Sequence, residues 1–157
     1  MTEPRLIVIA DPAGRRWQQF AEEAARCSPN GCGFDLIVVS WSTIIEQRGR
    51  LDGLPEFDQP AFVRIDSIGE SFALTRMLLV AGETGGSSVS PQPDWSQLEY
   101  RKGHLVHPSL VWRGWKTILV GLETSFDEMP HLKPLARPRD IVTMFDKTET
   151  SKRLQSA

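Results

Sequence analysis

The sequence predicts an α/β domain with a short, mainly parallel sheet and helices on both faces. Apolar runs of strand length, with many β-branched residues, begin near residues 5, 34 and 61. A helical segment follows each run, and this alternation is typical of βαβ units with parallel strands. The 157 residues fit a single domain, which can bury a core without a disulfide or a metal ion.

The first half of the chain carries the clearest elements. The strand runs are apolar and read as buried, and the first ends at the turn residues Asp11 and Pro12. In the first helix, Trp17, Phe20 and Ala24 recur at helical spacing with charged residues between them. Because crossovers between parallel strands are right-handed, these elements predict a Rossmann-like, three-layer unit. We expect strands over residues 5–10, 34–40 and 61–66, and helices over residues 15–26, 41–47 and 70–81.

The second half opens with a segment of different composition. Residues 83–97 are dominated by Gly, Ser, Pro and Gln, which predicts a flexible loop, and a short hairpin or extended stretch follows over residues 98–106. A wide apolar stripe then predicts the longest helix over residues 109–126.

Prolines and a final helix complete the chain. Pro130, Pro134 and Pro138 predict an extended connector. The last helix is expected over residues 140–155, with Ile141, Met144 and Phe145 turned inward. We therefore divide the chain into a Rossmann-like domain over residues 1–135 and a helix over residues 136–157 that leads out of it.

Composition excludes several classes of function. The net charge of −2 lacks the basic excess of a nucleic-acid-binding domain. The chain has no apolar run of about 18 residues that would span a membrane and no signal-peptide pattern. Cys27 and Cys32 make no disulfide framework and read as ordinary reduced thiols. We expect a cytoplasmic protein whose partners are a small molecule or another protein, and neither a nucleic acid nor a membrane.

Three weaker motifs favour structural roles. The loop from Asp11 to Gly14 lacks the glycine fingerprint of a dinucleotide site, and Asp11 is better explained as a helix cap. His104 and His107 have poor spacing for a metal, and no third ligand is evident, so no metal site is predicted. Of the tryptophans Trp95, Trp112 and Trp115, the latter two are expected to pack in the core.

The strand over residues 61–66 ends in the strongest candidate for a ligand site. Asp66 and Ser67 follow it, and polar residues at the carboxyl end of a parallel strand lie at the ligand-binding edge of this fold. A structural alternative has equal weight, because Ser67 and Glu70 have the spacing of a helix capping box. Both interpretations stay open on the sequence alone.

Three segments, over residues 62–70, 111–115 and 136–154, occur in an order that resembles the amino-terminal domain of bacterial ATP-grasp ligase-like proteins. The segment over residues 136–154 is similar to the stretch that enters their nucleotide domain, where a lysine matched by Lys147 reaches the ATP phosphates. Residues 62–70 resemble their Arg-hydrophobic-Asp-Ser-Pro-Gly-Glu segment, with Ile68 in place of the proline. Residues 111–115 resemble a helical segment that precedes the Asp-Lys stretch.

The resemblance implies a domain of an ATP-dependent carboxylate–amine or carboxylate–thiol ligase. It implies substrate contacts at Asp66, Ser67, Glu70 and Arg113, a nucleotide contact at Lys147, and no catalytic residue in this chain. The sequence stops at Ala157, where the ATP-grasp domain would begin. ATP and Mg²⁺ are therefore expected only with that domain, present in cis or as a partner, and the chain alone is expected to be inactive.

Two alternatives remain. A non-catalytic interaction module of the same ancestry would use the surface that the missing domain covers, and it leaves a homodimer open. Exposure of Ile141, Met144 and Phe145 would favour this alternative, since an uncovered apolar patch promotes association. A small flavodoxin-like or nucleotide-binding enzyme acting alone ranks last, because the chain has no recognisable phosphate loop.

Overall fold

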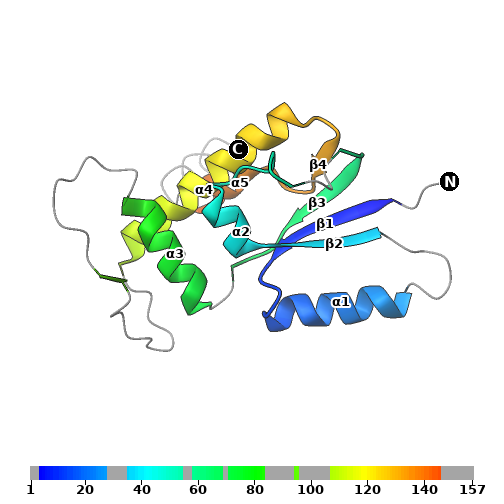
Figure 1. Cartoon of the computed structure of the whole chain (residues 1–157), viewed down its shortest axis with the longest axis horizontal. Coiled ribbons are helices and arrows are strands. Elements are labelled where there is room, and N and C mark those ends of the chain that lie inside the picture. Colours follow the sequence, from blue (N-terminus) through cyan, green and yellow to red (C-terminus); the bar gives the residue numbers. More distant parts are fainter. Residues whose placement is uncertain are drawn as a thin grey trace, which may run out of the picture.

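A computed structural model describes residues 4–27, 35–54, 58–68, 71–83, 94–95 and 107–145 (Figure 1). The elements follow the predicted alternation of strands and helices. In chain order they are β1 (Arg5–Ala10), α1 (Arg15–Cys27), β2 (Asp35–Ser40), α2 (Trp41–Glu46), β3 (Ala61–Ile65), α3 (Phe72–Glu83), α4 (Pro108–Glu128), β4 (Leu132–Pro134) and α5 (Pro138–Phe145). No helix in these ranges is long and apolar enough to cross a membrane.

The four strands form one parallel sheet in the order β2-β1-β3-β4. Arg5 at the start of β1 lies between Asp35 of β2 and Ala61 of β3, and Ala61 in turn faces Leu132 of β4. Helices lie on both sides of the sheet, with α1 along one face and α2 and α4 along the other (Figure 1). The predicted Rossmann-like, three-layer α/β fold is confirmed.

The fourth strand corrects the prediction of an extended connector between Pro130 and Pro138. The amide of Ala61 donates to the carbonyl of His131 at 3.2 Å, and the amide of Leu135 donates to the carbonyl of Val63 at 2.8 Å. Pro134 has no amide to donate, which the edge of a sheet tolerates. Pairing with β3, and not any local strand pattern, makes this segment a strand.

The main core lies between the sheet and the helices α2, α3 and α4. Alternate residues of the strands, among them Ile7, Ile9 and Val63, point into it and are at most 1% exposed. Trp41, Ile118 and Leu122 close it from the helices and are fully buried. α3 joins this layer mainly through α4, against which it packs along its length.

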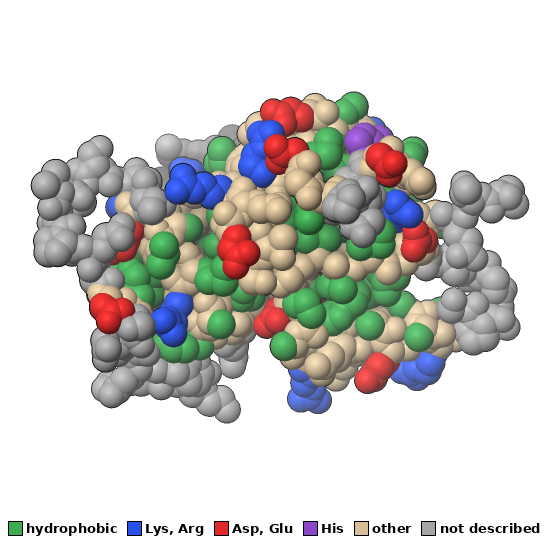
Figure 2. All heavy atoms as spheres, viewed as in Figure 1, with side chains coloured by type: hydrophobic (Ala, Val, Ile, Leu, Met, Phe, Trp, Pro, Cys, Tyr) green, Lys and Arg blue, Asp and Glu red, His purple; other side chains and the backbone are tan. Residues whose placement is uncertain are grey.

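The opposite face of the sheet is covered more thinly. The helix α1 contains no buried residue. Its Phe20 ring lies 4.6 Å beneath the guanidinium of Arg64 from β3, and Trp17 packs beside Phe20. On this face Phe62 remains 49% exposed, and Figure 2 shows apolar atoms at the surface between α1 and the rest of the molecule. One amphipathic helix thus shields only part of a four-stranded sheet.

Two further expectations are corrected. The strand β2 was expected to be buried, but it is an edge strand in which only Val39 is buried, with 8% of it exposed. In α5, Ile141 is half-buried as expected, whereas Met144 is 74% and Phe145 is 63% exposed. Most of the loop predicted over residues 83–97 lies outside the described residues, which include only Glu83, Asp94 and Trp95 of that range. The stretch over residues 98–106 and the helix beyond residue 145 also lie outside them.

Candidate functional site

Asp66 is held at the carboxyl end of β3 by contacts with two neighbouring elements. Its amide donates to the carbonyl of Ile9 in β1 at 2.9 Å, which extends the sheet by one bond beyond the strand. Its carbonyl accepts the indole Nε1–H of Trp41 at 3.1 Å. The side chain is only 9% exposed. The fold therefore places a carboxylate rigidly at the edge where parallel sheets bind ligands.

Two arginines and a serine surround this carboxylate. Asp66 Oδ1 accepts the amide of Ser67 at 3.0 Å and lies 3.6 Å from Nη1 of Arg16 and 3.7 Å from Nη2 of Arg64. Nη1 of Arg16 also donates to the hydroxyl of Ser67 at 2.7 Å. A buried charge needs such partners, and the two guanidinium groups supply them.

Arg16, Asp66 and Ser67 line a cavity of about 330 Å³ between the start of α1 and the approach to α3. Figure 2 shows a notch in this region, in which acidic side-chain atoms are visible. Two carboxylates and two guanidinium groups lie on its wall, together with a serine pair and apolar atoms. The lining residues are Asp11, Gly14, Arg15, Arg16, Trp17, Asp66, Ser67, Ile68 and Ser71.

The turn after β1 forms the other wall of the cavity. Asp11 Oδ1 accepts the amide of Ala13 at 3.1 Å, and the Asp11 carbonyl accepts the amide of Gly14 at 2.9 Å. The first helical bond runs from the Gln18 amide to the Gly14 carbonyl at 3.1 Å. Asp11 therefore holds the turn that precedes α1, and it does not cap the helix directly as the sequence suggested.

The capping alternative for Ser67 is decided by the position of α3. That helix begins at Phe72, and the hydroxyl of Ser71 accepts the amide of Leu74 at 3.4 Å. Ser71 is thus the capping residue, although the serine-to-glutamate spacing had favoured Ser67. The hydroxyl of Ser67 is engaged by Arg16 instead. Glu70 lies outside the described residues.

The structure does not place the other predicted ligand-binding residues at this cavity. Arg113 is an exposed residue of α4 and does not line the cavity. Its carbonyl accepts the hydroxyl of Thr117 at 3.0 Å, a bond internal to the helix. Lys147 lies outside the described residues. Of the predicted site residues, the structure places Asp66 and Ser67 together and separates them from Arg113.

Sequence reasoning missed Arg16, which lies 51 residues from Ser67 in the chain. Its only local signal is a basic residue in the first turn of the helix that follows the first strand. That signal identifies a site residue only once β1 and β3 are known to be neighbours, since adjacency brings the start of α1 beside the end of β3.

The histidine, tryptophan and cysteine residues singled out in the sequence do not form a site within the described residues. His107 precedes α4 in a left-handed conformation with φ of 47°, and its ring packs edge-on against Trp95 at 5.1 Å. The indole of Trp95 donates to Glu83 at 2.9 Å. Within the described ranges no three His, Cys, Asp or Glu side chains are grouped to hold a metal ion. Cys27 is exposed, while His104 and Cys32 lie outside those ranges.

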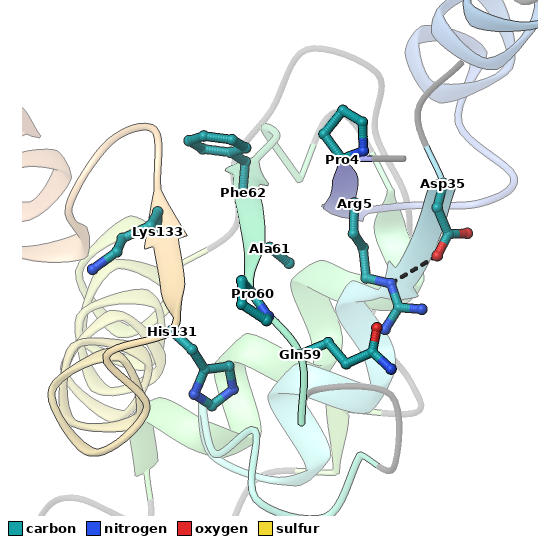
Figure 3. Close-up of a pocket in the computed structure, with 9 residues that line it drawn as sticks. All are labelled: Pro4, Arg5, Asp35, Gln59, Pro60, Ala61, Phe62, His131 and Lys133. Atoms are coloured by element: carbon teal, nitrogen blue, oxygen red, sulfur yellow. Dashed lines mark hydrogen bonds and ion pairs between the residues drawn. The ribbon is translucent and has the colours of Figure 1, made fainter. Parts of the chain in front are cut away.

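A larger cavity of about 720 Å³ lies at the opposite edge of the sheet, where the strands begin (Figure 3). Its charged groups do not converge, because Lys133 points to one side of β3 and Arg5 to the other. Arg5 is already paired with Asp35 at 2.7 Å. Ligands of parallel sheets bind at the carboxyl ends of the strands, so the smaller cavity is the better candidate.

Comparison with protein-family models, with curated proteins and with solved structures finds no match to this chain. The functional argument therefore rests on the geometry of the cavity and on the resemblance of the sequence segments described above.

Proposed function

We propose that this chain is the amino-terminal, substrate-binding domain of an ATP-grasp-type carboxylate–amine or carboxylate–thiol ligase. The observation that carries the proposal is the charged cavity at the carboxyl ends of β1 and β3. There Arg16 donates to Ser67 at 2.7 Å and lies 3.6 Å from the buried carboxylate of Asp66. The two residues after β3 are those that the resemblance assigns to substrate.

The chemistry that this function requires is divided between domains. In such ligases ATP activates a carboxylate as an acyl phosphate, which the amine or thiol then attacks. The resemblance assigns nucleotide and Mg²⁺ to a separate ATP-grasp domain, and within the described residues no three His, Cys, Asp or Glu side chains are grouped to hold a metal ion. This chain would orient the substrate through Arg16, Asp66 and Ser67, and orientation alone contributes substantially to the rate of such reactions.

This division between domains predicts how strongly the isolated chain binds Mg–ATP. We expect isothermal titration of Mg–ATP into the 157-residue chain to give weak binding or none. Any residual binding should fall in the variant Lys147→Ala, since a lysine is a point cation suited to phosphate. The matched control Lys133→Ala changes an exposed lysine of β4 and should have no effect. Tight Mg–ATP binding by the chain alone would overturn the proposal.

The mass of the native product provides an independent test. We expect mass spectrometry of the protein from its own cells to give a mass far above 17.6 kDa if an ATP-grasp domain is joined in cis. If the native mass is 17.6 kDa, a separate ATP-grasp protein must copurify with the chain. Absence of both would contradict the proposal.

A second candidate function is a non-catalytic interaction module. The exposure of Met144 at 74% and of Phe145 at 63% favours it, because exposed apolar side chains promote association. Light scattering over a range of concentrations would then show association that Phe145→Ser weakens. The control Asp140→Ser alters an exposed polar residue of the same helix and should leave association unchanged. A monomer at every concentration excludes self-association through this helix.

A further inference from the structure

The carboxylate of Asp66 has one oxygen committed and one available. The contacts with Ser67, Arg16 and Arg64 all involve Oδ1. Within the described part of the chain, no hydrogen bond is made to Oδ2. An ionised carboxylate accepts through both oxygens, so Oδ2 is suited to a hydrogen-bond donor from a ligand in the cavity.

The guanidinium of Arg16 is likewise used on one side only. Its Nη1 contacts Ser67 and Asp66, whereas Nε and Nη2 donate no hydrogen bond to the described residues. The side chain is 67% exposed, so it can adjust to a ligand, while Asp66 is held by the sheet. An arginine presents donors in a planar fork that matches a carboxylate. Arg16 thus supplies the anion-binding half of the site.

Among the described residues that line the cavity, acidic and basic side chains are equal in number. Asp11 and Asp66 are the acids, and Arg15 and Arg16 are the bases. A site for phosphate or for a dicarboxylate would be expected to present an excess of positive charge. A balanced site with a fixed acid and an adaptable base instead complements a ligand that carries both charges.

We infer that this cavity binds the zwitterionic head of a free α-amino acid, with the ammonium group at Asp66 and the carboxylate at Arg16. The inference rests on the proposed function, in which this cavity is the substrate site, and it names the substrate class. Ser67 orients Arg16 through the hydrogen bond at 2.7 Å.

Three small probes test the inference on the whole chain. L-alanine has both charges, N-acetyl-L-alanine has only the carboxylate, and L-alaninamide has only the ammonium group. We expect ligand-observed NMR titration to show L-alanine binding at least about tenfold more tightly than either blocked probe, because each loses a charge-assisted hydrogen bond. Equal binding of the carboxylate-only probe would identify a simple anion site and overturn the inference. Failure of L-alanine to bind would also overturn it.

Two variants test which residue binds each charged group of the ligand. Arg16→Gln should weaken L-alanine binding about tenfold, because the guanidinium that contacts the ligand's carboxylate is lost. L-alanine should then bind this variant no more tightly than L-alaninamide does. L-alanine should bind the Asp66→Asn variant no more tightly than N-acetyl-L-alanine does. The control Arg26→Gln makes the same change at the far end of α1, where Arg26 pairs with Glu23, and this variant should bind as the unaltered chain does. Because Arg16 is exposed, its variant tests the inference even if Asp66→Asn is unstable.

The outcomes separate this inference from the proposed function. Tight Mg–ATP binding by the chain would overturn the proposed division between domains and leave the preference for L-alanine intact. Equal binding of all three probes would overturn the zwitterion site and leave the ligase assignment to be tested by the native mass.

Discussion

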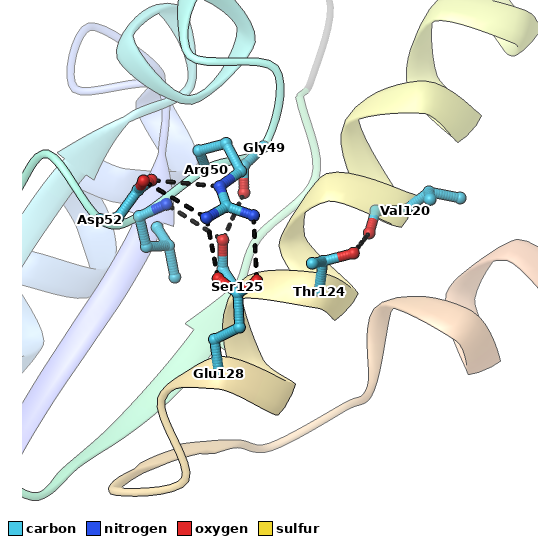
Figure 4. Close-up of polar contacts among 8 residues, drawn as sticks. Gly49, Arg50, Asp52, Val120, Thr124, Ser125 and Glu128 are labelled. Atoms are coloured by element: carbon cyan, nitrogen blue, oxygen red, sulfur yellow. Dashed lines mark hydrogen bonds and ion pairs between the residues drawn. The ribbon is translucent and has the colours of Figure 1, made fainter.

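Ser125 is a buried hydroxyl that joins the turn after α2 to α4. It is fully buried, donates to the carbonyl of Gly49 at 3.2 Å and accepts the amide of Leu51 at 3.1 Å (Figure 4). Thr124 beside it is exposed and donates only to the carbonyl of Val120, within the same helix. Neighbouring hydroxyl residues thus have different energetic roles.

We expect Ser125→Ala to lower the free energy of unfolding by about 1–3 kcal/mol, because two buried backbone groups lose their partner. The control Thr124→Val should change it by less than about 0.5 kcal/mol, since the backbone bond of that turn persists without the hydroxyl. Urea unfolding of both variants checks the difference. Equal losses would show that the Ser125 bonds are not what stabilises this turn.

Near the end of α4, Arg50 lies between two acidic side chains, those of Asp52 and Glu128 (Figure 4). It donates to Asp52 at 3.2 Å and to Glu128 at 2.8 Å. The hydrogen bonds that Arg50 donates to Asp52 and Glu128 raise the pKa of Arg50 above its usual value. The hydrogen bond from Arg50 is the main cause that holds the pKa of the Asp52 carboxyl below its usual 3.8.

The lowered pKa of Asp52 gives this pair a defined pH dependence. A carboxyl whose pKa is lower in the folded state stabilises the fold above its unfolded pKa, and this contribution is lost as the pH falls through the folded pKa. We expect NMR titration of the Asp52 carboxyl to give a pKa below 3.8 that rises in Arg50→Gln. Arg26→Gln, far along the chain in α1, should leave it unchanged. An unaltered Asp52 titration in Arg50→Gln would contradict the assignment.

At the scale of elements, α3 and α4 meet through two buried glycines. A Cβ added at Gly114 would lie 2.0 Å from the carbonyl oxygen of Leu78, and one added at Gly82 would lie 2.2 Å from that of Leu110. Both obstacles are backbone atoms, which cannot move without shifting a helix. The close approach of these helices therefore depends on the absence of side chains at both positions.

We expect Gly114→Ala to destabilise the protein by about 1–3 kcal/mol, because the overpacked helices must separate. Gly53→Ala is the matched control, since its added Cβ meets only the flexible side chain of Gln47, at 3.3 Å. That control should stay within about 0.5 kcal/mol of the unaltered chain. Thermal unfolding of the two variants measures the difference, and comparable melting temperatures would refute the role of the glycine contact.

At the scale of the whole molecule, the two faces of the sheet are protected unequally. The face toward α2 and α4 holds the core, and α4 alone has six buried residues. The other face is covered by α1, which has none, and leaves Phe62 49% exposed. Because local opening requires less energy where fewer apolar groups are buried, stability should be distributed unevenly between the layers.

Native-state hydrogen exchange should reveal this distribution. We expect the amides in the middle of α1 to exchange with a lower opening free energy than those in the middle of α4. The amides of β1 between them serve as an internal reference, because that strand is paired on both sides. Equal protection of α1 and α4 would mean that the molecule opens only as a whole.

Local pattern predicted most of the elements and part of the site. The apolar runs at β1 and β3 and the amphipathic pattern of α1 depend on neighbouring residues, so the sequence alone was sufficient for them. The strand β4 was missed because its three residues include Pro134 and have no strand pattern of their own. Phe145 was expected to face inward because helical spacing shows which residues share a face and not whether another element covers that face.

The sequence by itself determined the α/β class and the position of Asp66 and Ser67 at the end of a strand, because alternation, apolar runs and turn residues are local properties. Only the tertiary structure decided the strand order β2-β1-β3-β4 and the fourth strand. That order brings Arg16 to Ser67 across 51 residues of chain and leaves Arg113 elsewhere. The physical reason is that hydrogen bonds between strands and the packing of helices join distant segments, and no local pattern specifies which segments meet.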